Sequence, residues 1–459
     1  MKFKVPHTYV LLMGLILVAA VSTWLIPAGR YARADQDGRE LINPESFHAV
    51  KSNPANVPDI LLAFPKGLIE VSDIVFYIFI IGGAFGVLNR TGTIQAGINF
   101  IVRRVGKKRA LIVPVLTLVF AVGGGSIGIA EETLIFLPPL LMLARSLGYD
   151  SLVAGGIALV GANAGFASAF MNPFTVGVAQ GIVGLPLFSG IEFRSVVWLI
   201  ITTVTIIFMS RYASRVRSKP SLSSMYELDL KRQPVEDHQV KDRFTKGHVA
   251  VLMVSIMALA ALAVGAIYWK WGILQLSALF FGLSIIAGPL GGLTLDETAQ
   301  SFIKGAADIT YAALVVGLAR GTLVILRDAY VIDTITHAMA AAVQQLPSSF
   351  SVMGIYIMQN GLNFIIPSGS GHAAVAMPIL APLGDLLGIS RQTNVLAYQL
   401  GNGFTNVFTP TQGYFMAALG ILKIPWSTWV RWLFPLLFIW VIIGAGAVLV
   451  AHAIQWGPF

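Results

Sequence analysis

The sequence predicts an all-α polytopic membrane protein built from two repeats of inverted topology. Apolar residues make up 56% of the 459-residue chain and charged residues only 12%. Apolar runs long enough to span a bilayer recur almost to the C-terminus. One order of segments also occurs twice, each time with a helical hairpin and a long helix that small and polar residues interrupt.

Composition excludes several other classes of protein. The net charge is +9, but Lys and Arg gather in a few loops, which indicates membrane topology rather than a nucleic-acid interface. Cysteine is absent, which excludes disulfides and thiolate sites. The sequence has no Gly-rich phosphate loop followed by Lys-Ser/Thr, and its histidines lack metal-ligand spacing. We therefore expect no enzyme, metal or cofactor, apart from Na+ or H+ as a coupling ion.

The first half begins with a predicted span over Thr8 to Pro27, after the short basic segment Met1 to His7. The run is long and no A-x-A-like site follows it, so a span is favoured over a signal peptide. The segments expected next are an external polar stretch (Gly29 to Pro58), a span (Ile69 to Leu88) and an interfacial helix (Thr93 to Val105). A basic cluster places the end of that helix in the cytoplasm, and the N-terminus with it: Arg103, Arg104, Lys107, Lys108 and Arg109.

The stretch Gly123 to Leu141, GGGSIGIAEETLIFLPPLL, is unsuited to an ordinary spanning helix. Charges and non-helical backbone are tolerated within a bilayer only where protein or a water-filled cavity surrounds them. We predict a re-entrant hairpin over 111–147, entered from the cytoplasm, with the glycines and carboxylates at its tip. A long helix over 152–183 follows, broken by the sequence GANAGFASAFMNP.

The second half repeats this order. A second hairpin is predicted over 350–387, entered from outside, and a second broken helix over 394–422 contains GNGFTNVFTPTQG. The predicted organisation is: 1–68, N-terminal scaffold helix and external loop; 69–210, first repeat; 211–248, basic cytoplasmic linker; 249–309, scaffold helices; and 310–459, second repeat.

Matched landmarks support the repeat. Pro138 precedes Gly148 by ten residues, and Pro378 precedes Gly388 by the same interval. A Gly-Phe pair then enters each polar break, and a pair ending in proline leaves it: Gly165-Phe166 with Asn172-Pro173, and Gly403-Phe404 with Thr409-Pro410. With one hairpin entered from each side, the repeats are inverted, an arrangement that in secondary transporters places the substrate site at the repeat interface near the midplane.

The hairpin tips and helix breaks supply the candidate site residues. Unwound segments free carbonyl groups that bind cations, and half-helix N-termini favour anions. The predicted substrate-binding residues are Ser126, Glu131, Glu132, Asn163, Asn172, Ser370, His372, Asn402, Thr405, Asn406, Thr409 and Gln412. The predicted ligands of a coupling ion are Gly125, Ser126, Asn163, Ser368 and Asn402.

Several of these residues have two interpretations. Glu131 or Glu132 contacts substrate or a coupling cation; the alternative is that these carboxylates only cap a hairpin arm or face a water-filled vestibule. Adjacent helical positions point about 100° apart, so we expect the two residues to have different roles. His372 titrates during transport, or is a hydrogen-bonded histidine at the hairpin tip, which we favour. Arg320 lies inside a span and either has a structural partner, with Asp308 as the candidate, which we favour, or contacts substrate. Asp73 and Asp333 look like boundary charges. Five tryptophans fit interfacial belts: Trp269, Trp271, Trp426, Trp429 and Trp432.

Four segments carry a family resemblance: KVPHTYVLL with TWLIPAG at the N-terminus, GGGSIGIAEE, ANAGFASAFMNPFTVGVAQ and LGNGFTNVFTPTQG. Over nearly the whole chain, the sequence resembles the YfcC-like branch of the C4-dicarboxylate anaerobic carrier (DcuC-type) family, within the ion transporter superfamily. The resemblance implies a homodimeric secondary carrier of the bacterial inner membrane, with scaffold and transport domains and an elevator movement. It would place Thr8 to Pro27 and Val249 to Leu290 in the scaffold.

The resemblance leaves the substrate open among C4-dicarboxylates, short-chain fatty acids and basic amino acids. Sodium-coupled dicarboxylate carriers of the superfamily have Ser-Asn-Thr motifs at the hairpin tips, whereas this chain has Gly-Ser-Ile-Gly with Glu131-Glu132, and Ser-Gly-Ser-Gly-His. Acidic groups repel a dianion and favour an ammonium or guanidinium group. We therefore expect a carrier of amino acids, basic ones such as arginine and ornithine first, that exchanges them or couples to H+ or Na+. The alternatives are a dicarboxylate or short-chain carboxylate carrier and, more remotely, an ion channel.

Overall fold

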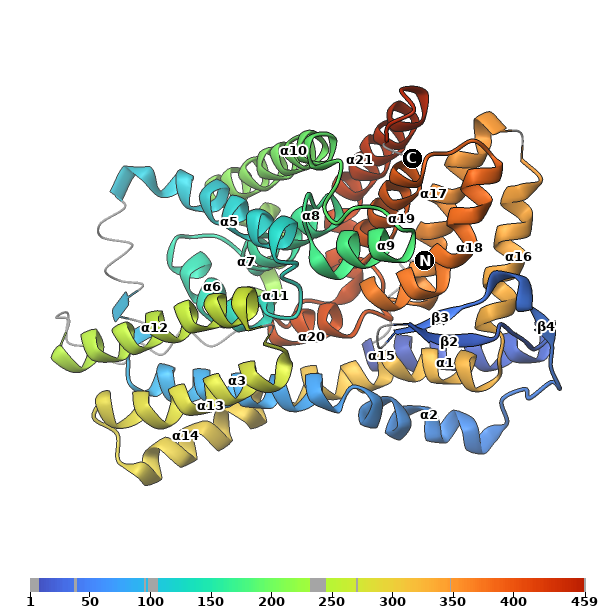
Figure 1. Ribbon diagram of the computed structural model, residues 1–459. Helices are drawn as coiled ribbons and strands as arrows, with labels where there is room; N and C mark the ends of the chain where they lie inside the picture. Colours follow the sequence, from blue (N-terminus) through green and yellow to red (C-terminus); the bar gives the residue numbers. More distant parts are fainter. Residues whose placement is uncertain are drawn as a thin grey trace.

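The computed structural model describes residues 8–36, 39–94, 96–97, 106–231, 245–269, 271–346 and 348–457, and most of them are helical. Residues 1–7, most of the predicted interfacial helix (Thr93 to Val105) and 232–244 of the predicted linker lie outside the described residues. Figure 1 shows a lower layer of long helices beneath a second, larger group of helices.

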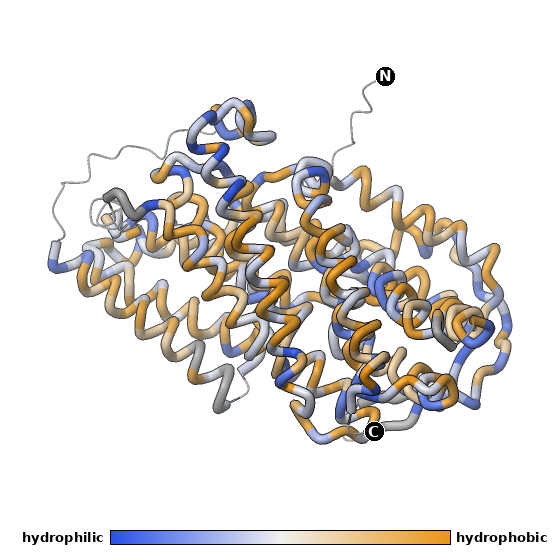
Figure 2. Tube along the Cα trace, turned by 90° about the horizontal axis from the view of Figure 1, so that it is seen from above, coloured by the Kyte–Doolittle hydropathy of each residue, from blue (hydrophilic) through white to orange (hydrophobic). Residues whose placement is uncertain are grey.

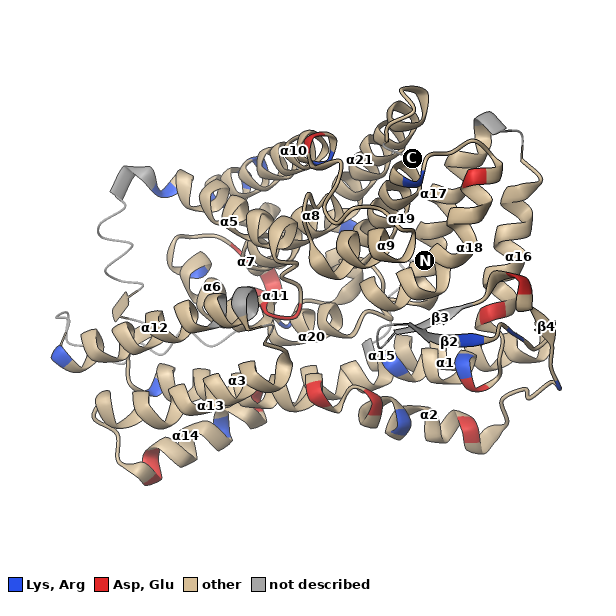
Figure 3. Ribbon diagram, viewed as in Figure 1, with Lys and Arg blue, Asp and Glu red and all other residues tan. Residues whose placement is uncertain are grey.

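Six described helices are long and apolar enough to cross a membrane, in agreement with a multi-pass protein. They are Ser72–Arg90, Arg109–Ser126, Ile191–Ser218, Ile273–Leu290, Thr310–Asp328 and Trp426–Ala453. Figure 2 shows long hydrophobic stretches along the helices, and Figure 3 shows that many helical turns carry no charged residue.

The lower layer consists of helices from both halves of the chain. α3 packs against α13 and α14, both α1 and α2 pack against α15, and α12 packs against α13. Their bounds are α1 Thr8–Leu25, α2 Val57–Glu70, α3 Ser72–Arg90, α12 Lys246–Tyr268, α13 Ile273–Leu290, α14 Leu295–Asp308 and α15 Thr310–Asp328.

Two helices of this layer differ from the sequence prediction: most of α2 lies in the loop predicted within 1–68, and α14 lies over Thr294 to Lys304, which the sequence predicts to be a polar cytoplasmic connection within 249–309. α2 begins with a capping box in which Asn56 and Asp59 bond each other's backbone N–H groups, and α14 begins with the same box from Thr294 and Glu297. Gly67 lets α2 approach the backbone of α15 so closely that a β-carbon there would meet it. Capping and close packing thus give α2 and α14 a helical structure that hydropathy alone did not predict.

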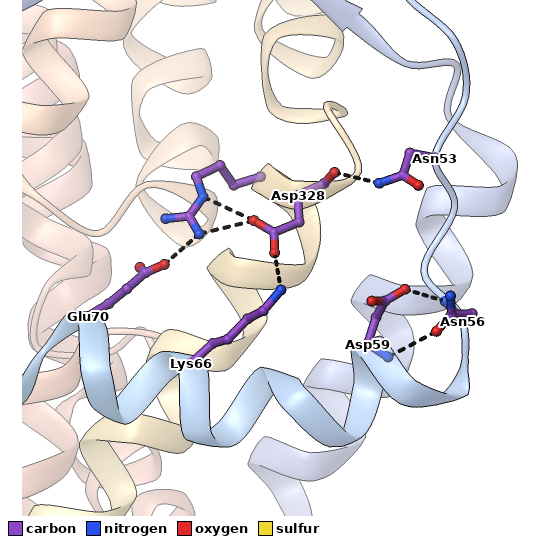
Figure 4. A network of polar contacts seen from close by, with 7 residues as sticks. Asn53, Asn56, Asp59, Lys66, Glu70 and Asp328 are labelled. Atoms are coloured by element: carbon purple, nitrogen blue, oxygen red, sulfur yellow. Dashed lines mark hydrogen bonds and ion pairs between the residues drawn. The ribbon is translucent and has the colours of Figure 1, made fainter.

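Arg320 has a structural partner, as we predicted, but that partner is Glu70 and not Asp308. The Nε of Arg320 lies 2.9 Å from a carboxylate oxygen of Glu70, at the C-terminal end of α2, and Arg327 contacts the other oxygen. Figure 4 shows how this network continues through Asp328 to Lys66, with 2.8 Å between the Lys66 ammonium and the Asp328 carboxylate. Sequence spacing favoured a partner on the same helical stretch, whereas packing of α2 on α15 supplies one from the other half of the chain.

The polar stretch that follows α1 forms two small antiparallel ladders, β1 (Gly29–Arg30) with β4 (His48–Ala49), and β2 (Arg33–Gln36) with β3 (Arg39–Ile42). It contacts α16 (Ile332–Gln344). Burial raises the pKa of Tyr31 to about 12, with Asp333 adding to the shift, so the hydroxyl stays protonated beside Nδ1 of His337, 2.9 Å away.

Asp333 is not the boundary charge that we predicted from the sequence. Its side chain is 5% exposed, and it accepts hydrogen bonds from the Arg33 guanidinium at 2.9 Å and from the Tyr31 N–H at 3.0 Å. Asp333→Ala leaves both donors without their acceptor, so we expect the free energy of unfolding to fall by about 2 kcal/mol. Thermal unfolding in detergent measures this loss, with Glu45→Ala, an exposed carboxylate of the same excursion, as the matched control. Equal stability of both variants would contradict the prediction.

The upper group contains two helical hairpins. The first is α5 (Ile112–Ser126) with α6 (Thr133–Ser146), and the second is α17 (Ser348–Ile365) with α18 (Gly369–Leu386). A helix of broken form follows each hairpin, and a 28-residue helix then follows each: α10 (Ile191–Ser218) and α21 (Trp426–Ala453). α5 packs against α8 as α17 packs against α19. The order of elements therefore occurs twice in the structure.

The broken helices lose their regular form at the predicted polar stretches. The first consists of α7 (Ser151–Gly155), a π-helical turn (Gly156–Val160), α8 (Gly161–Ala167), a break at 168–172, a second π-helical turn (Pro173–Gly177) and α9 (Val178–Ile182). The second consists of α19 (Arg391–Thr405), a break at 406–412 and α20 (Gly413–Ile421). Gly148 and Gly388 have positive φ angles just before the two broken helices, and Gly184 and Lys423 just after them.

Two tryptophans of the predicted interfacial belt lie in the core instead. Trp429 is fully buried and donates its indole N–H to the carbonyl of Val407 at 2.8 Å, and Trp432 packs beside it. Trp269 is exposed, as a belt residue would be. The buried pair fills the space between α21 and the broken helices. Amino-acid composition alone cannot distinguish such core tryptophans from tryptophans at a membrane interface.

The described part of the predicted linker contains short helical turns. After α10 it forms a short 3-10 turn (Pro220–Leu222) and α11 (Tyr226–Leu230). The Asp229 carboxylate accepts from the N–H and hydroxyl of Ser151 at 3.0 and 2.5 Å, at the start of α7. The described part of the linker is thus hydrogen-bonded to the first broken helix.

Candidate functional site

The tip of the first hairpin is a loop of six residues between α5 and α6. The carbonyl of Gly123 accepts from the N–H groups of Ile127 and Gly128, which ends α5, and Gly128 turns the chain with a φ of 75°. A β-carbon at Gly128 would lie 2.6 Å from Oδ1 of Asn172. Glycine is therefore required both for the turn and for the close approach to the first break.

Both hairpin tips meet at the segment Met171 to Thr175. From the first tip, the carbonyl of Gly125 accepts from the Met171 N–H at 3.2 Å. From the second, Gly369 lies so close that an added β-carbon would be 2.9 Å from Cγ2 of Thr175. Residues predicted from separate halves of the chain are thus brought to one place.

The two broken helices are joined by hydrogen bonds near their breaks. The Asn163 amide on α8 donates to the carbonyl of Gly403 at 2.9 Å, and the Gln399 amide on α19 donates to the carbonyl of Ala169 at 3.0 Å. Gly403 also packs against the backbone of Ala167 with no room for a side chain. Carbonyls near an interrupted helix need partners, and here each break receives one from the other broken helix.

A buried amide cluster surrounds the second break. Asn363 of α17 donates to the Thr405 hydroxyl at 2.6 Å and to Oδ1 of Asn406 at 2.9 Å, and it accepts from Asn402 at 2.7 Å. His372 continues the cluster, with Nδ1 3.1 Å from the Asn402 amide and Nε2 2.6 Å from Oε1 of Gln359. These side chains are all buried, so they fix the hairpin against the broken helix.

Several polar atoms near the two breaks are buried without a partner in the described structure. They are Oδ1 of Asn163, Nδ2 of Asn172, Oγ1 of Thr175, Nε2 of Gln359, Oδ1 of Asn402 and Oγ1 of Thr409. Unpartnered buried polar atoms are rare because each costs free energy. Both acceptors and donors are present, so together they are suited to a small ligand with groups of both kinds.

The carboxylates of Glu131 and Glu132 lie at the other side of the first tip. Both are partly buried, and Glu132 accepts from the Ala130 N–H at 3.0 Å. They lie near enough to Tyr77 of α3 and Tyr414 of α20 to interact electrostatically with them. Among the described residues, no Lys, Arg or His forms an ion pair with either one. The site thus contains two acidic groups without a counter-charge.

The remaining predicted site residues have local roles or lie beside the cluster. Ser126 bonds back to the carbonyl of Val122, and Ser368 caps α18 through the Gly371 N–H at 3.2 Å. Ser370 lies in the first turn of α18, and Gln412 reaches Oδ1 of Asn406 at 3.5 Å. His372 is hydrogen-bonded, as we predicted. It is fully buried inside the amide cluster.

Four polar residues of this region were missing from the sequence prediction: Gln359, Asn363, Gln399 and Arg194. They lie on helices, outside the Gly- and Pro-rich breaks on which the sequence prediction rests. Asn363 and Gln359 are polar positions on an otherwise apolar hairpin arm. Intramembrane polar residues facing the protein interior are functional candidates by default, and that signal would have found all four.

Comparisons with known proteins agree with a transporter. The family model described as C4-dicarboxylate anaerobic carrier matches residues 5–453. The chain is 34% identical to the "Putative basic amino acid antiporter YfcC" of Escherichia coli K12, over 97% of each chain. It is 27% identical to an uncharacterised protein of Haemophilus influenzae, over 96% of each. Among solved structures it is similar to the YdaH transporter of Alcanivorax borkumensis, with a TM-score of 0.45, 15% identity and coverage of 99% of this chain and 100% of that one.

Proposed function

Because this chain belongs to the C4-dicarboxylate anaerobic carrier family, a family of membrane transporters, we propose that it exchanges basic amino acids such as arginine and ornithine across the bacterial inner membrane. The observation that carries the proposal is the pair Glu131 and Glu132, which has no basic partner among the described residues and lies at the first hairpin tip, near Tyr414 just after the second break. The name of the Escherichia coli relative supports the same substrate class.

The acidic pair discriminates by charge. Two carboxylates removed from bulk water repel a dicarboxylate and attract the guanidinium or ammonium group of a basic amino acid. The unpartnered donors and acceptors at the breaks then bind the polar atoms of the amino acid itself. A substrate with a cationic end and a zwitterionic end matches both parts of the site.

We further propose an elevator movement of the upper group against the lower layer, in a homodimer. The support is that the contacts between the two groups run mainly through α15 with α20 and α3 with α6, whereas contacts within each group are far more extensive. The two occurrences of hairpin, broken helix and long helix support inverted repeats with the proposed bounds 69–210 and 310–459. The N-terminus is then cytoplasmic, and 211–248 is the cytoplasmic linker.

A coupling ion, Na+ or H+, is part of the proposal. The unpartnered Oδ1 atoms of Asn163 and Asn402 are neutral oxygen ligands of the kind that a sodium ion takes. Gly125 and Ser126 lie at the first hairpin tip and Ser368 at the second. Exchange measured with and without a Na+ gradient, at fixed pH, distinguishes the two ions.

The test is counterflow into proteoliposomes. Vesicles preloaded with arginine should take up labelled arginine, ornithine and lysine, and vesicles preloaded with buffer alone should take up far less. A channel would instead give flux that internal substrate does not stimulate. Uptake confined to fumarate or succinate would contradict the proposal.

A C4-dicarboxylate or short-chain carboxylate carrier is the second candidate. It is favoured by the family description and by Arg194, a buried cation beside the broken helices that has no acidic partner among the described residues. The same counterflow experiment decides between the two, because the substrates are opposite in net charge.

A further inference from the structure

Arg194 is a fully buried arginine without an acidic partner in the described structure. It lies in the first turn of α10 and is 0% exposed. Its Nη1 donates to Oε1 of Gln399 at 2.7 Å and its Nη2 to Oε1 of Gln392 at 3.3 Å, while the guanidinium lies 5.2 Å from the ring of Trp456. Its Nε has no partner. All three neighbours are neutral, so the positive charge is solvated by dipoles but not cancelled.

This charge lies close to the first break. Gln399 accepts from Arg194 with its oxygen and donates with its nitrogen to the carbonyl of Ala169, within the break. Two hydrogen bonds and one amide group therefore separate the guanidinium from the carbonyl oxygen of Ala169 in the break, a distance of about 8 Å at most. At that range a buried charge acts strongly, because little water screens it.

The first break offers donors that face no acceptor. Nδ2 of Asn172 and the hydroxyl of Thr175 are buried and unpartnered, and both hairpin tips contact this segment. An amide N–H and a hydroxyl are suitable donors to a carboxylate. Neither donor carries a charge, so a carboxylate bound there would need a counter-charge from another residue. Arg194 is a buried cation that is connected to this break through the side chain of Gln399.

We propose that Arg194 is a specificity-determining residue: its charge selects ligands that carry a carboxylate, which binds at Asn172 and Thr175. The inference rests on the proposed function for its substrate class and adds the orientation of that substrate. The α-carboxylate faces the first break, and the cationic side chain faces Glu131 and Glu132. Arg194 acts through the electrostatic field rather than by contact.

The test is discrimination between arginine and agmatine, which is arginine without its carboxylate. The half-inhibitory concentrations of both are measured against exchange of labelled arginine in proteoliposomes. Wild type should prefer arginine at least tenfold. Arg194→Met should reduce that preference by roughly 10- to 30-fold, the effect of one charge at about 8 Å in an effective dielectric of about 20. Arg194→Lys should retain most of it, and Arg215→Met, an exposed arginine of the same helix, all of it.

Gln392→Glu separates charge from structure. It keeps Arg194 and supplies a carboxylate that can accept from Nη2, while the Ser189 hydroxyl, which now contacts the Gln392 amide at 2.5 Å, can donate to the other oxygen. The fold should persist, checked by thermal unfolding, yet the preference for arginine should fall as in Arg194→Met. An unchanged preference in folded Gln392→Glu, or no preference in wild type, would overturn the inference.

The proposed function can fail separately. If wild type exchanges succinate and not arginine, the basic amino acid proposal is wrong, and Arg194 is tested with succinate against succinamate, its monoamide. Arg194→Met and Gln392→Glu should then reduce the preference for succinate about tenfold or more, whereas an unchanged preference would overturn the role of Arg194 as well.

Discussion

Replacing Glu131 and Glu132 together by glutamine is expected to abolish arginine exchange. Glutamine keeps the size and most hydrogen bonds of glutamate but removes the charge that attracts the substrate guanidinium. Loss of one partner from a desolvated ion pair costs about 3–5 kcal/mol, which corresponds to roughly a 100- to 1,000-fold weaker interaction. Counterflow of labelled arginine into preloaded proteoliposomes measures the loss.

The single variants show which carboxylate contacts the substrate. Because Glu132 accepts from the Ala130 N–H, Glu131 has more freedom to face the substrate, and we expect Glu131→Gln to have the larger effect. The adjacent acidic pair Asp296 and Glu297 lies at the start of α14, with Asp296 exposed and Glu297 half-buried, and provides the matched double control, Asp296→Asn with Glu297→Gln. Wild-type exchange by the folded Glu131 and Glu132 double variant would remove the basis of the proposed substrate.

Replacing Gly403 by alanine is expected to stop transport and destabilise the protein. A single methyl group at this position would overlap the backbone of Ala167, so α8 and α19 must separate. Separation strains or breaks the bond from Asn163 to the Gly403 carbonyl. Overpacking of this kind costs about 1–3 kcal/mol, and transport should fall more than tenfold because the site is formed by both helices.

The matched control is Gly282→Ala in α13, where an added β-carbon meets nothing within 4 Å. This substitution should leave transport unchanged and alter stability by less than about 1 kcal/mol, with alanine the better helix former. Thermal unfolding and counterflow on both variants complete the test. Equal behaviour of the two would mean that the contact of α8 with α19 is dispensable.

Much of the helical framework could be predicted from the sequence, since apolar runs, basic loops and Gly- or Pro-containing breaks are local signals. The helices α2 and α14 were not predicted, because an amphipathic helix that begins with a capping box resembles a polar loop when only hydropathy is considered. Trp429 and Trp432 were misplaced because a buried aromatic pair and an interfacial belt have the same composition.

The candidate site was harder to predict because most of its contacts join residues far apart in the chain. The breaks identified Asn163, Asn402 and Asn406 by their local sequence. No local pattern could show that Gln399 bonds the Ala169 carbonyl or that Arg320 pairs with Glu70. Such partners depend on how helices from the two halves pack, which the spacing of residues along one helix does not contain.

The hydrogen bonds that join the two broken helices also constrain how the protein is made. Asn163 and Gly403 are 240 residues apart, and Ala169 and Gln399 are 230 apart. During synthesis, the first half therefore enters the bilayer long before Gln399 and Gly403 have been synthesised. Until then, the carbonyl of Ala169 either has no hydrogen-bond donor in a low-dielectric environment or binds water. The contact of α19 with α8 therefore forms only after the first half has been inserted. A ribosome-bound chain that ends before position 391 should accordingly be sensitive to proteases at the first break.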